Sequence, residues 1–298
     1  MWFKNLYLFK LEPGFSLSPE ELHQELEQRL FKGCSATQRE SFGWVAPLGR
    51  DSESLTHATN GYILITMARQ ERLLPASVIR EEMEQRVADI ELQEDRKVSN
   101  KEKKEMREAI EFELLPRAFT RTQNMDAWID PKEGWVVINT PSAKRAEELA
   151  NLLRKTLGSF PVAPPETKNP PAASMTRWLE QGALPAPFTF GEDCELRSDG
   201  EEKGVAAFRK HELLADDVST ALKNGKYVSK LGLIWDEKIQ FMLTEDLQLT
   251  RLRFLDVLEE QMQHEDPQSH AERLDIEFAL MTGEVTQMLG QLLAQMDV

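Results

Sequence analysis

The sequence predicts an α+β fold in which antiparallel sheets carry flanking helices and a charged helical hairpin projects from one sheet. Two observations support this fold class. Short apolar stretches separated by turn residues occur in both halves of the chain, which is typical of hairpins and meanders. Residues 75–116, in contrast, contain no Gly, have Pro only at their ends, and are rich in charged helix formers.

The first region predicts a β-α-β-β unit. Residues 2–11 have the pattern of a strand, and residues 18–31 that of a helix with Ser18 as N-cap, Pro19 in its first turn and Glu21 completing a capping box. Strands are expected at 42–45 and 62–67. His57, in LTHATNG, is assigned a structural role in the turn before the second of these strands.

The middle of the chain predicts two helices, then two strands, then one helix. Apolar residues step by three or four through residues 75–116, and Ser99 or Asn100 is the expected break between the two helices. Residues 125–141 then predict two strands joined at 131–134. The next segment, 142–158, predicts an amphipathic helix that starts at Ser142 and stops at Gly158.

A proline-rich segment, 161–173, predicts a linker between two regions. After it we expect a short helix, strands around CEL and GVAAFR, a helix starting at Asp216 or Asp217, a three-stranded meander, and a C-terminal helix interrupted or adjusted near Gly283. The predicted organisation is an N-terminal α+β region, a projecting hairpin with a basic loop, the linker, and a C-terminal α+β region. Their respective boundaries are 1–74 plus 124–160, 75–123, 161–173 and 174–298.

Composition excludes several classes of protein. No apolar run approaches the roughly 20 residues of a membrane helix, and the N-terminus lacks a leader pattern, so we expect a cytoplasmic protein. Cys34 and Cys194 stand in no metal-ligand spacing, which favours two reduced thiols. No cofactor or metal is expected.

The net charge of −15 is distributed unevenly. Residues 256–298 carry −9, whereas 96–121 carry +3 and 203–238 carry +2. Local field decides whether a phosphate backbone is attracted, so the acidic total does not exclude nucleic acid. The candidate phosphate contacts are Lys and Arg side chains in these basic windows and on the helix at 142–158. They are Lys101, Lys103, Lys104, Arg107, Arg117, Arg121, Lys144, Arg145, Lys210 and Lys226.

Phe119 lies between Arg117 and Arg121 in LLPRAFTRTQ. In an exposed loop it would stack on bases or wedge between them, and packing in the core is an equally weighted alternative.

The sequence lacks the common nucleophile, phosphate-loop and zinc-protease motifs. Asp236 and Lys238 have the D-x-K spacing of some Mg²⁺-dependent nucleases, but turn residues explain this spacing better. An acidic scaffold that binds protein partners is a further alternative.

Several segments resemble the RdgC family of recombination-associated proteins: WFKNL, GWVAPLG, LTHATNG, LLPRAF, AWID, SAKRAEELANLLRKTLGSFPV, RLRFLD and FALMTGE. They occur in order along essentially the whole chain. The resemblance implies a non-enzymatic, nucleoid-associated protein whose elongated, curved subunits form a ring-shaped homodimer. It also implies sequence-independent binding of double-stranded DNA inside the ring, restraint of RecA-promoted strand exchange, and a link to replication. Direct contact with RecA is left open.

A ring would explain basic windows in an acidic chain. Bases would line the inner wall around DNA, and the acidic C-terminal helix would lie outward.

Overall fold

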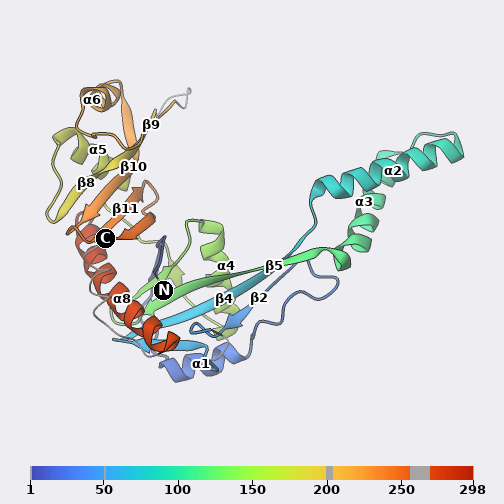
Figure 1. The fold of residues 1–298 in the computed structure, drawn as a ribbon, viewed down its shortest axis with the longest axis horizontal. Coiled ribbons are helices and arrows are strands. Elements are labelled where there is room, and N and C mark those ends of the chain that lie inside the picture. The colour runs from blue at the N-terminus through green and yellow to red at the C-terminus, as the bar shows by residue number, and fades with distance from the viewer. Residues whose placement is uncertain (1, 50–51, 199–203, 256–268, 298) are drawn as a thin grey trace.

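Two antiparallel sheets and the helices around them form a curved molecule (Figure 1). The computed structural model describes residues 2–49, 52–198, 204–255 and 269–297. The α+β class predicted from the sequence is confirmed. The strongly acidic segment 256–268 lies outside the described residues.

The first sheet has the strand order β2-β4-β5-β6-β1-β7, with β3 paired to β4. The strands are β1 (Tyr7–Leu11), β2 (Glu40–Val45), β3 (Thr56–Thr59), β4 (Tyr62–Leu73), β5 (Phe119–Asp130), β6 (Trp135–Ile138) and β7 (Val162–Ala163). Strand β3 was not predicted, and His57 lies in this strand rather than in a turn. Its Nε2 is 2.8 Å from Oδ1 of Asp275, far along the chain.

Alternate residues of this sheet enter two different cores, because successive side chains of a strand point to opposite faces. On one face, Ile65 and Ile129 pack with the two helices α1 (Pro19–Glu27) and α4 (Ala143–Leu157). On the other face, Leu64 and Trp128 join the core of the C-terminal half. The central part of the first sheet is therefore buried on both sides, whereas residues 119–124 of β5 are exposed.

Capping residues define both covering helices. Ser18 and Glu21 form the expected capping box of α1. This helix ends at Glu27, earlier than predicted, and Leu30 beyond it is 46% exposed and forms a bridge to Trp44. Helix α4 begins after Ser142 and ends at Gly158, as expected. Gly158 has a φ of 75°, which glycine adopts without strain.

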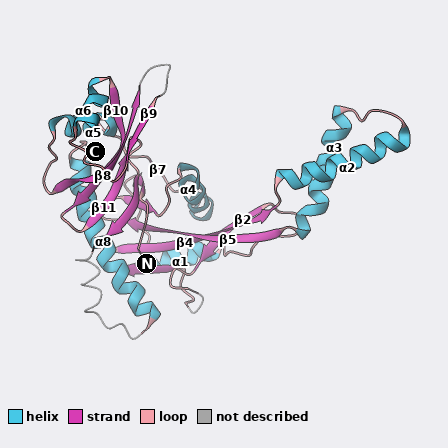
Figure 2. Ribbon diagram, turned by 45° about the horizontal axis from the view of Figure 1, so that its top comes forward, coloured by secondary structure: helices cyan, strands magenta, loops and turns pink. Residues whose placement is uncertain are grey.

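A long ribbon of β4 and β5 extends from the first sheet, with β2 paired to β4 from Thr66 to Glu71. Strands β4 and β5 pair from Ile63↔Ile129 to Leu73↔Phe119. At the far end lie α2 (Ala76–Glu94), α3 (Asn100–Leu114) and the short 3-10 helix η1 (Leu115–Arg117) (Figures 1 and 2). We call residues 69–123 the arm. The predicted break at Ser99 is confirmed, since Ser99 caps α3. Residues 119–123 were predicted as a loop and instead form the start of β5.

The second sheet has the strand order β12-β11-β10-β8-β9. Its strands are β8 (Phe188–Ser198), β9 (Val205–Phe208), β10 (Lys226–Trp235), β11 (Ile239–Thr244) and β12 (Leu249–Phe254), with helices α5 (Pro171–Gln181), α6 (Asp216–Lys223) and α8 (His270–Ala294). Helices α5 and α6 pack on β10. The expected interruption of the C-terminal helix is wrong, because α8 runs through Gly283 unbroken.

The two halves share one core. Phe3, Leu6 and Trp128 lie in the same apolar cluster as Val228 and Phe278. Leu6 also forms a backbone bridge to Leu249 of β12. Within the proline-rich segment, β7 pairs with β1 and α5 begins at Pro171. The proposed domain boundaries stay a prediction.

Candidate nucleic-acid interface

Helix α3 carries the densest group of predicted phosphate contacts. The Lys101 side chain is 86% exposed, and its Nζ lies 3.9 Å from Oε1 of Glu105. Among the residues that the structure describes, Lys103, Lys104 and Arg107 form no ion pair, and Lys104 and Arg107 are exposed. These cations can therefore meet a phosphate without first breaking an internal contact.

The segment around Phe119 differs from the predicted basic loop. Arg117 ends η1 and is exposed, and Phe119 begins β5 with 84% of its surface exposed. The alternative prediction that Phe119 packs in the core is thus wrong. Its partner across the ribbon is Leu73, which is 44% exposed, so the two form an apolar pair at the surface. Arg121, two residues further along β5, faces Glu71 and forms an ion pair with it.

Glu71 belongs to a network of alternating charges at the root of the arm. Arg69, whose side chain is 12% exposed, lies 2.9 Å from Glu71, 2.8 Å from Glu40 and 3.8 Å from Glu148. Although burial opposes the charge of Arg69, these carboxylates raise its pKa above the usual value. The hydrogen bond from Arg121 lowers the pKa of Glu71, and Arg69 adds to this effect. The network therefore stays charged at neutral pH.

The two predicted contacts on α4 differ from each other. Lys144 is exposed, whereas the side chain of Arg145 is 29% exposed and lies 3.6 Å from Glu148. Arg145 also donates a 3.3 Å hydrogen bond to Gln123 of β5. Arg145 consequently links α4 to the ribbon, in addition to its predicted contact with a phosphate.

Lys226 begins β10 of the second sheet and Lys210 lies just after β9, and Figure 1 shows this sheet far from α3. Lys210 is exposed, and its backbone N–H donates to Asp193 at 2.9 Å. The Lys226 ammonium donates to Ser198 at 2.7 Å and to the carbonyl of Gly204 at 3.2 Å. The structure thus does not gather the predicted contacts into one patch.

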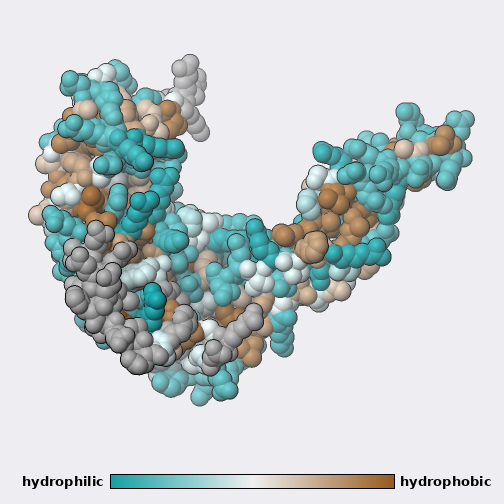
Figure 3. Space-filling model, in the orientation of Figure 1, coloured by the Kyte–Doolittle hydropathy of each residue, from teal (hydrophilic) through white to brown (hydrophobic). Residues whose placement is uncertain are grey.

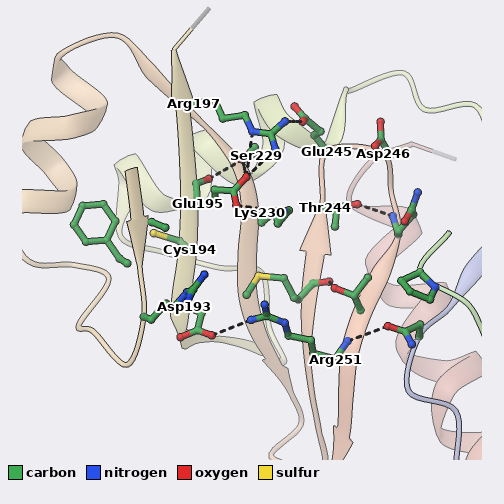
Figure 4. Close-up of a pocket in the computed structure, with 18 residues that line it drawn as sticks. Asp193, Cys194, Glu195, Arg197, Ser229, Lys230, Thr244, Glu245, Asp246 and Arg251 are labelled. Carbon is green, nitrogen blue, oxygen red and sulfur yellow. Dashed lines mark hydrogen bonds and ion pairs between the residues drawn. The ribbon is translucent and has the colours of Figure 1, made fainter. Parts of the chain in front are cut away.

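The open face of the second sheet holds further basic residues, of which Arg197 and Arg251 were not predicted as phosphate contacts. A depression of about 490 Å³ on this face is lined by Arg197, Arg251 and Lys230 together with acids (Figure 4). Each cation has an acidic neighbour: Arg197 lies 2.8 Å from Glu245, and Arg251 lies 3.6 Å from Asp193. Charged residues alternate with Cys194 and Leu196 along β8, and this period of two, which places Asp193, Glu195 and Arg197 on one face, was the signal available in the sequence for Arg197.

The D-x-K residues form a strand turn. Asp236 and Glu237 adopt φ angles of 47° and 54° between β10 and β11. Lys238 lies 3.2 Å from Asp236 and 3.2 Å from Glu284, and these contacts raise its pKa although burial opposes the charge. Within the described ranges, no group of three or more His, Cys, Asp or Glu side chains has the arrangement of a metal site. No helix in the same ranges is long and apolar enough to cross a membrane.

Comparison with known proteins identifies the family. A sequence model described as "RdgC: Putative exonuclease, RdgC" matches residues 1–298. The chain belongs to the RdgC family. It is 41% identical to the recombination-associated protein RdgC of Aeromonas hydrophila over 294 residues, covering 99% of this chain and 97% of the relative. RdgC proteins of Psychromonas ingrahamii and Tolumonas auensis are 39% and 37% identical over the same shares.

The names of the relatives and of the family model point to different roles. The relatives are named for an association with recombination, whereas the family model is named for a possible exonuclease. The family resemblance noted in the sequence is confirmed over the whole chain.

Proposed function

We propose that this protein binds double-stranded DNA without reading its sequence, as a ring-shaped homodimer that encircles the duplex in the nucleoid. By occupying DNA it restrains RecA-promoted recombination, and it links recombination to replication. The observation that carries this proposal is the set of exposed, unpaired cations on α3 of a chain with net charge −15. Unpaired Lys and Arg bind phosphates irrespective of sequence, because release of counterions from DNA supplies the free energy.

The curvature of the subunit supports encirclement. Figure 1 shows the arm rising at one end of the first sheet and the second sheet rising at the other. Two such arcs joined at both ends would enclose a channel. In this arrangement the arm projects toward the partner or the DNA, and the second sheet turns its open face inward.

Exposed apolar side chains on the arm support self-association. Leu73, Val78, Phe112 and Phe119 are 44%, 43%, 67% and 84% exposed. Figure 3 shows apolar surface over the helical pair and its junction with the ribbon. Large exposed apolar patches mark interaction surfaces. Phe119 would serve here as a dimer contact rather than the DNA wedge considered from the sequence.

DNA binding is tested by fluorescence anisotropy on two duplexes of unrelated sequence, with Mg²⁺ present and salt increased in steps. We expect equal affinities, intact DNA, and a slope of several units in log affinity against log salt. Absence of binding at low salt would contradict the proposal and favour a scaffold for protein partners.

Encirclement is tested on a nicked circular duplex. Complexes formed at low salt should survive a high-salt wash on the circle and be lost after the circle is cut, since only a closed ring is held topologically. Equal loss from both DNA forms would exclude a ring. Light scattering of the wild type and Phe119→Ser measures the dimer directly.

The family description makes an exonuclease the second candidate. Incubation of end-labelled duplex with Mg²⁺ or Mn²⁺ tests it, with Asp236→Asn as the matched variant. Shortened products that disappear in the variant would replace the binding proposal with a metal-dependent nuclease.

Restraint of recombination is tested by RecA strand exchange on DNA preloaded with the protein.

A further inference from the structure

A groove of about 270 Å³ opens between α2 and α3 on the part of the arm nearest the ribbon. Its apolar lining comes from Ala76, Ile79 and Met83, and its polar lining from Ser77, Arg80 and Arg107. The space is several times the ~30 Å³ occupied by one water molecule, so a phosphate group fits. Neither the family match nor the predictions from sequence assign a ligand to this groove, and Arg80 was not among the predicted contacts.

The two arginines of the groove have no acidic partner. Within the described part of the chain, neither Arg80 nor Arg107 forms an ion pair or a side-chain hydrogen bond, and both are exposed. The other two arginines of the helical pair are held by carboxylates. Arg86 lies 2.9 Å from Glu82 and 2.7 Å from Glu113.

Arg96 likewise lies 2.5 Å from Glu94 and 2.8 Å from Glu102. The hydrogen bonds that Arg86 and Arg96 donate to these glutamates raise the pKa of both guanidinium groups. Glu82, Glu94, Glu102 and Glu113 are thus occupied by Arg86 and Arg96, and no carboxylate of the described residues forms an ion pair with Arg80 or Arg107.

A second groove between the same helices has the opposite character. Its lining includes Asp89, Glu102 and Glu105, with Arg86 as its only cation. An anion is repelled there and attracted to the first groove. The contrast indicates that the Arg80–Arg107 groove is a distinct local feature of the helical pair.

We propose that Arg80 and Arg107 together hold one phosphate of the DNA backbone in this groove. Planar guanidinium groups donate paired hydrogen bonds to phosphate oxygens, and their stems rest on the apolar floor made by Ile79 and Met83. Lys104 lies three residues before Arg107 and is therefore its neighbour on the helix surface, where it meets the adjacent phosphate. This inference rests on the proposed binding of duplex DNA. It places one phosphate contact at the end of the helical pair nearest the ribbon.

The test compares Arg80→Gln, Arg107→Gln and the double variant with Arg86→Gln, in the full-length protein. Anisotropy with one duplex is measured from low to high salt. Each single variant keeps one guanidinium in the groove and should retain most of the salt slope. The double variant should lose about 0.9 units of slope, the value for one phosphate, and on the order of tenfold in affinity at 0.1 M salt.

Arg86→Gln is the matched control, because it removes the same charge from the same helical pair at a site already held by acids. Its slope should equal that of the wild type. A double variant with the wild-type slope would overturn the proposal, and so would losses of about 0.9 units in each single variant, which indicate two separate phosphates. Thermal melting confirms folding of each variant. If the wild type itself fails to bind DNA, the proposed function fails rather than the groove alone.

Discussion

Glu71 and Arg121 face each other across the β4–β5 ribbon and are joined by an ion pair at the root of the arm. The same carboxylate lies 2.9 Å from Arg69. Arg121 therefore shares its charge with an internal acid, unlike the unpaired cations of α3. This ion pair stabilises the ribbon and at the same time weakens the attraction of Arg121 for a phosphate.

Replacing Glu71 by Gln should strengthen DNA binding, because it removes one negative charge and leaves Arg121 free for a phosphate. We expect a gain of roughly threefold to tenfold in affinity at 0.1 M salt and a loss of about 0.2–1 kcal/mol in unfolding free energy. Anisotropy and urea denaturation measure the two effects. Glu40→Gln is the control, since Glu40 contacts Arg69 but not Arg121. Equal gains in both variants would show that Arg121 is not specifically released.

The same pair predicts a pH dependence of stability. The pKa of Glu71 is lowered in the folded protein, so its stabilising effect is complete above its unfolded pKa of about 4.3 and is lost as pH falls through the lower folded value. Urea denaturation between pH 6 and pH 3 should show a steeper loss of stability for the wild type than for Glu71→Gln. Parallel curves would contradict the assignment.

Capping of α3 supplies a third prediction. The Ser99 side chain accepts from the N–H of Glu102, and the Glu102 carboxylate accepts from the N–H of Ser99. Ser99→Ala should cost about 1 kcal/mol of local stability. Hydrogen exchange of α3 amides measures this cost in the full-length protein. Unchanged protection in the first turn of α3 would contradict it.

Glu102 makes the first turn of α3 sensitive to acid. Hydrogen bonds from Arg96 and then Ser99 lower its pKa to about 2. Its contribution is therefore present above the unfolded pKa of about 4.3 and is lost as pH falls toward about 2. Glu102→Gln keeps the capping box without the charge, so its exchange protection should not change in this window.

Local signals in the sequence were sufficient for the helix caps and failed for the start of β5 and for β3. Ser18, Ser99 and Ser142 each stand directly before a helix that they cap. Residues 119–124 are all exposed, so β5 shows no alternation there and looks like a loop. Strand β3 has only four residues, too few for a periodic pattern.

The charged network and the groove depend on register and helix packing. Glu71 meets Arg121 only because β4 and β5 pair in one particular alignment. Arg80 and Arg107 share a groove only because α2 folds back against α3. These residues lie 50 and 27 positions apart in the printed sequence, and no spacing rule connects them. The sequence therefore marks residues 96–121 as basic but does not reveal which arginines the neighbouring acids already occupy.

A buried hydrogen bond between β2 and α4 gives a prediction about stability. The indole N–H of Trp44 donates to Thr156 Oγ1 at 3.0 Å, and the Thr156 hydroxyl donates to the carbonyl of Leu152 at 2.8 Å. Thr156→Val keeps the shape but leaves the indole N–H unpaired, at a cost of about 1–3 kcal/mol. Thr156→Ser keeps the acceptor and should cost less. Urea denaturation followed by Trp fluorescence compares them, and equal costs would exclude the hydrogen bond as the cause.

Two glycines should respond to alanine with opposite signs. A Cβ at Gly43 would lie 2.4 Å from Cα of Phe31, and this backbone is held by the bridge between Leu30 and Trp44. Gly43→Ala should therefore destabilise the protein by about 3 kcal/mol or more.

A Cβ at Gly283 meets no atom within 4 Å, and Gly283 lies inside the continuous helix α8. Gly283→Ala should stabilise the protein by about 0.5–1 kcal/mol, because alanine loses less backbone entropy in a helix. Thermal and urea denaturation measure both variants. Destabilisation by Gly283→Ala would contradict an unbroken α8 and restore the interruption expected from the sequence.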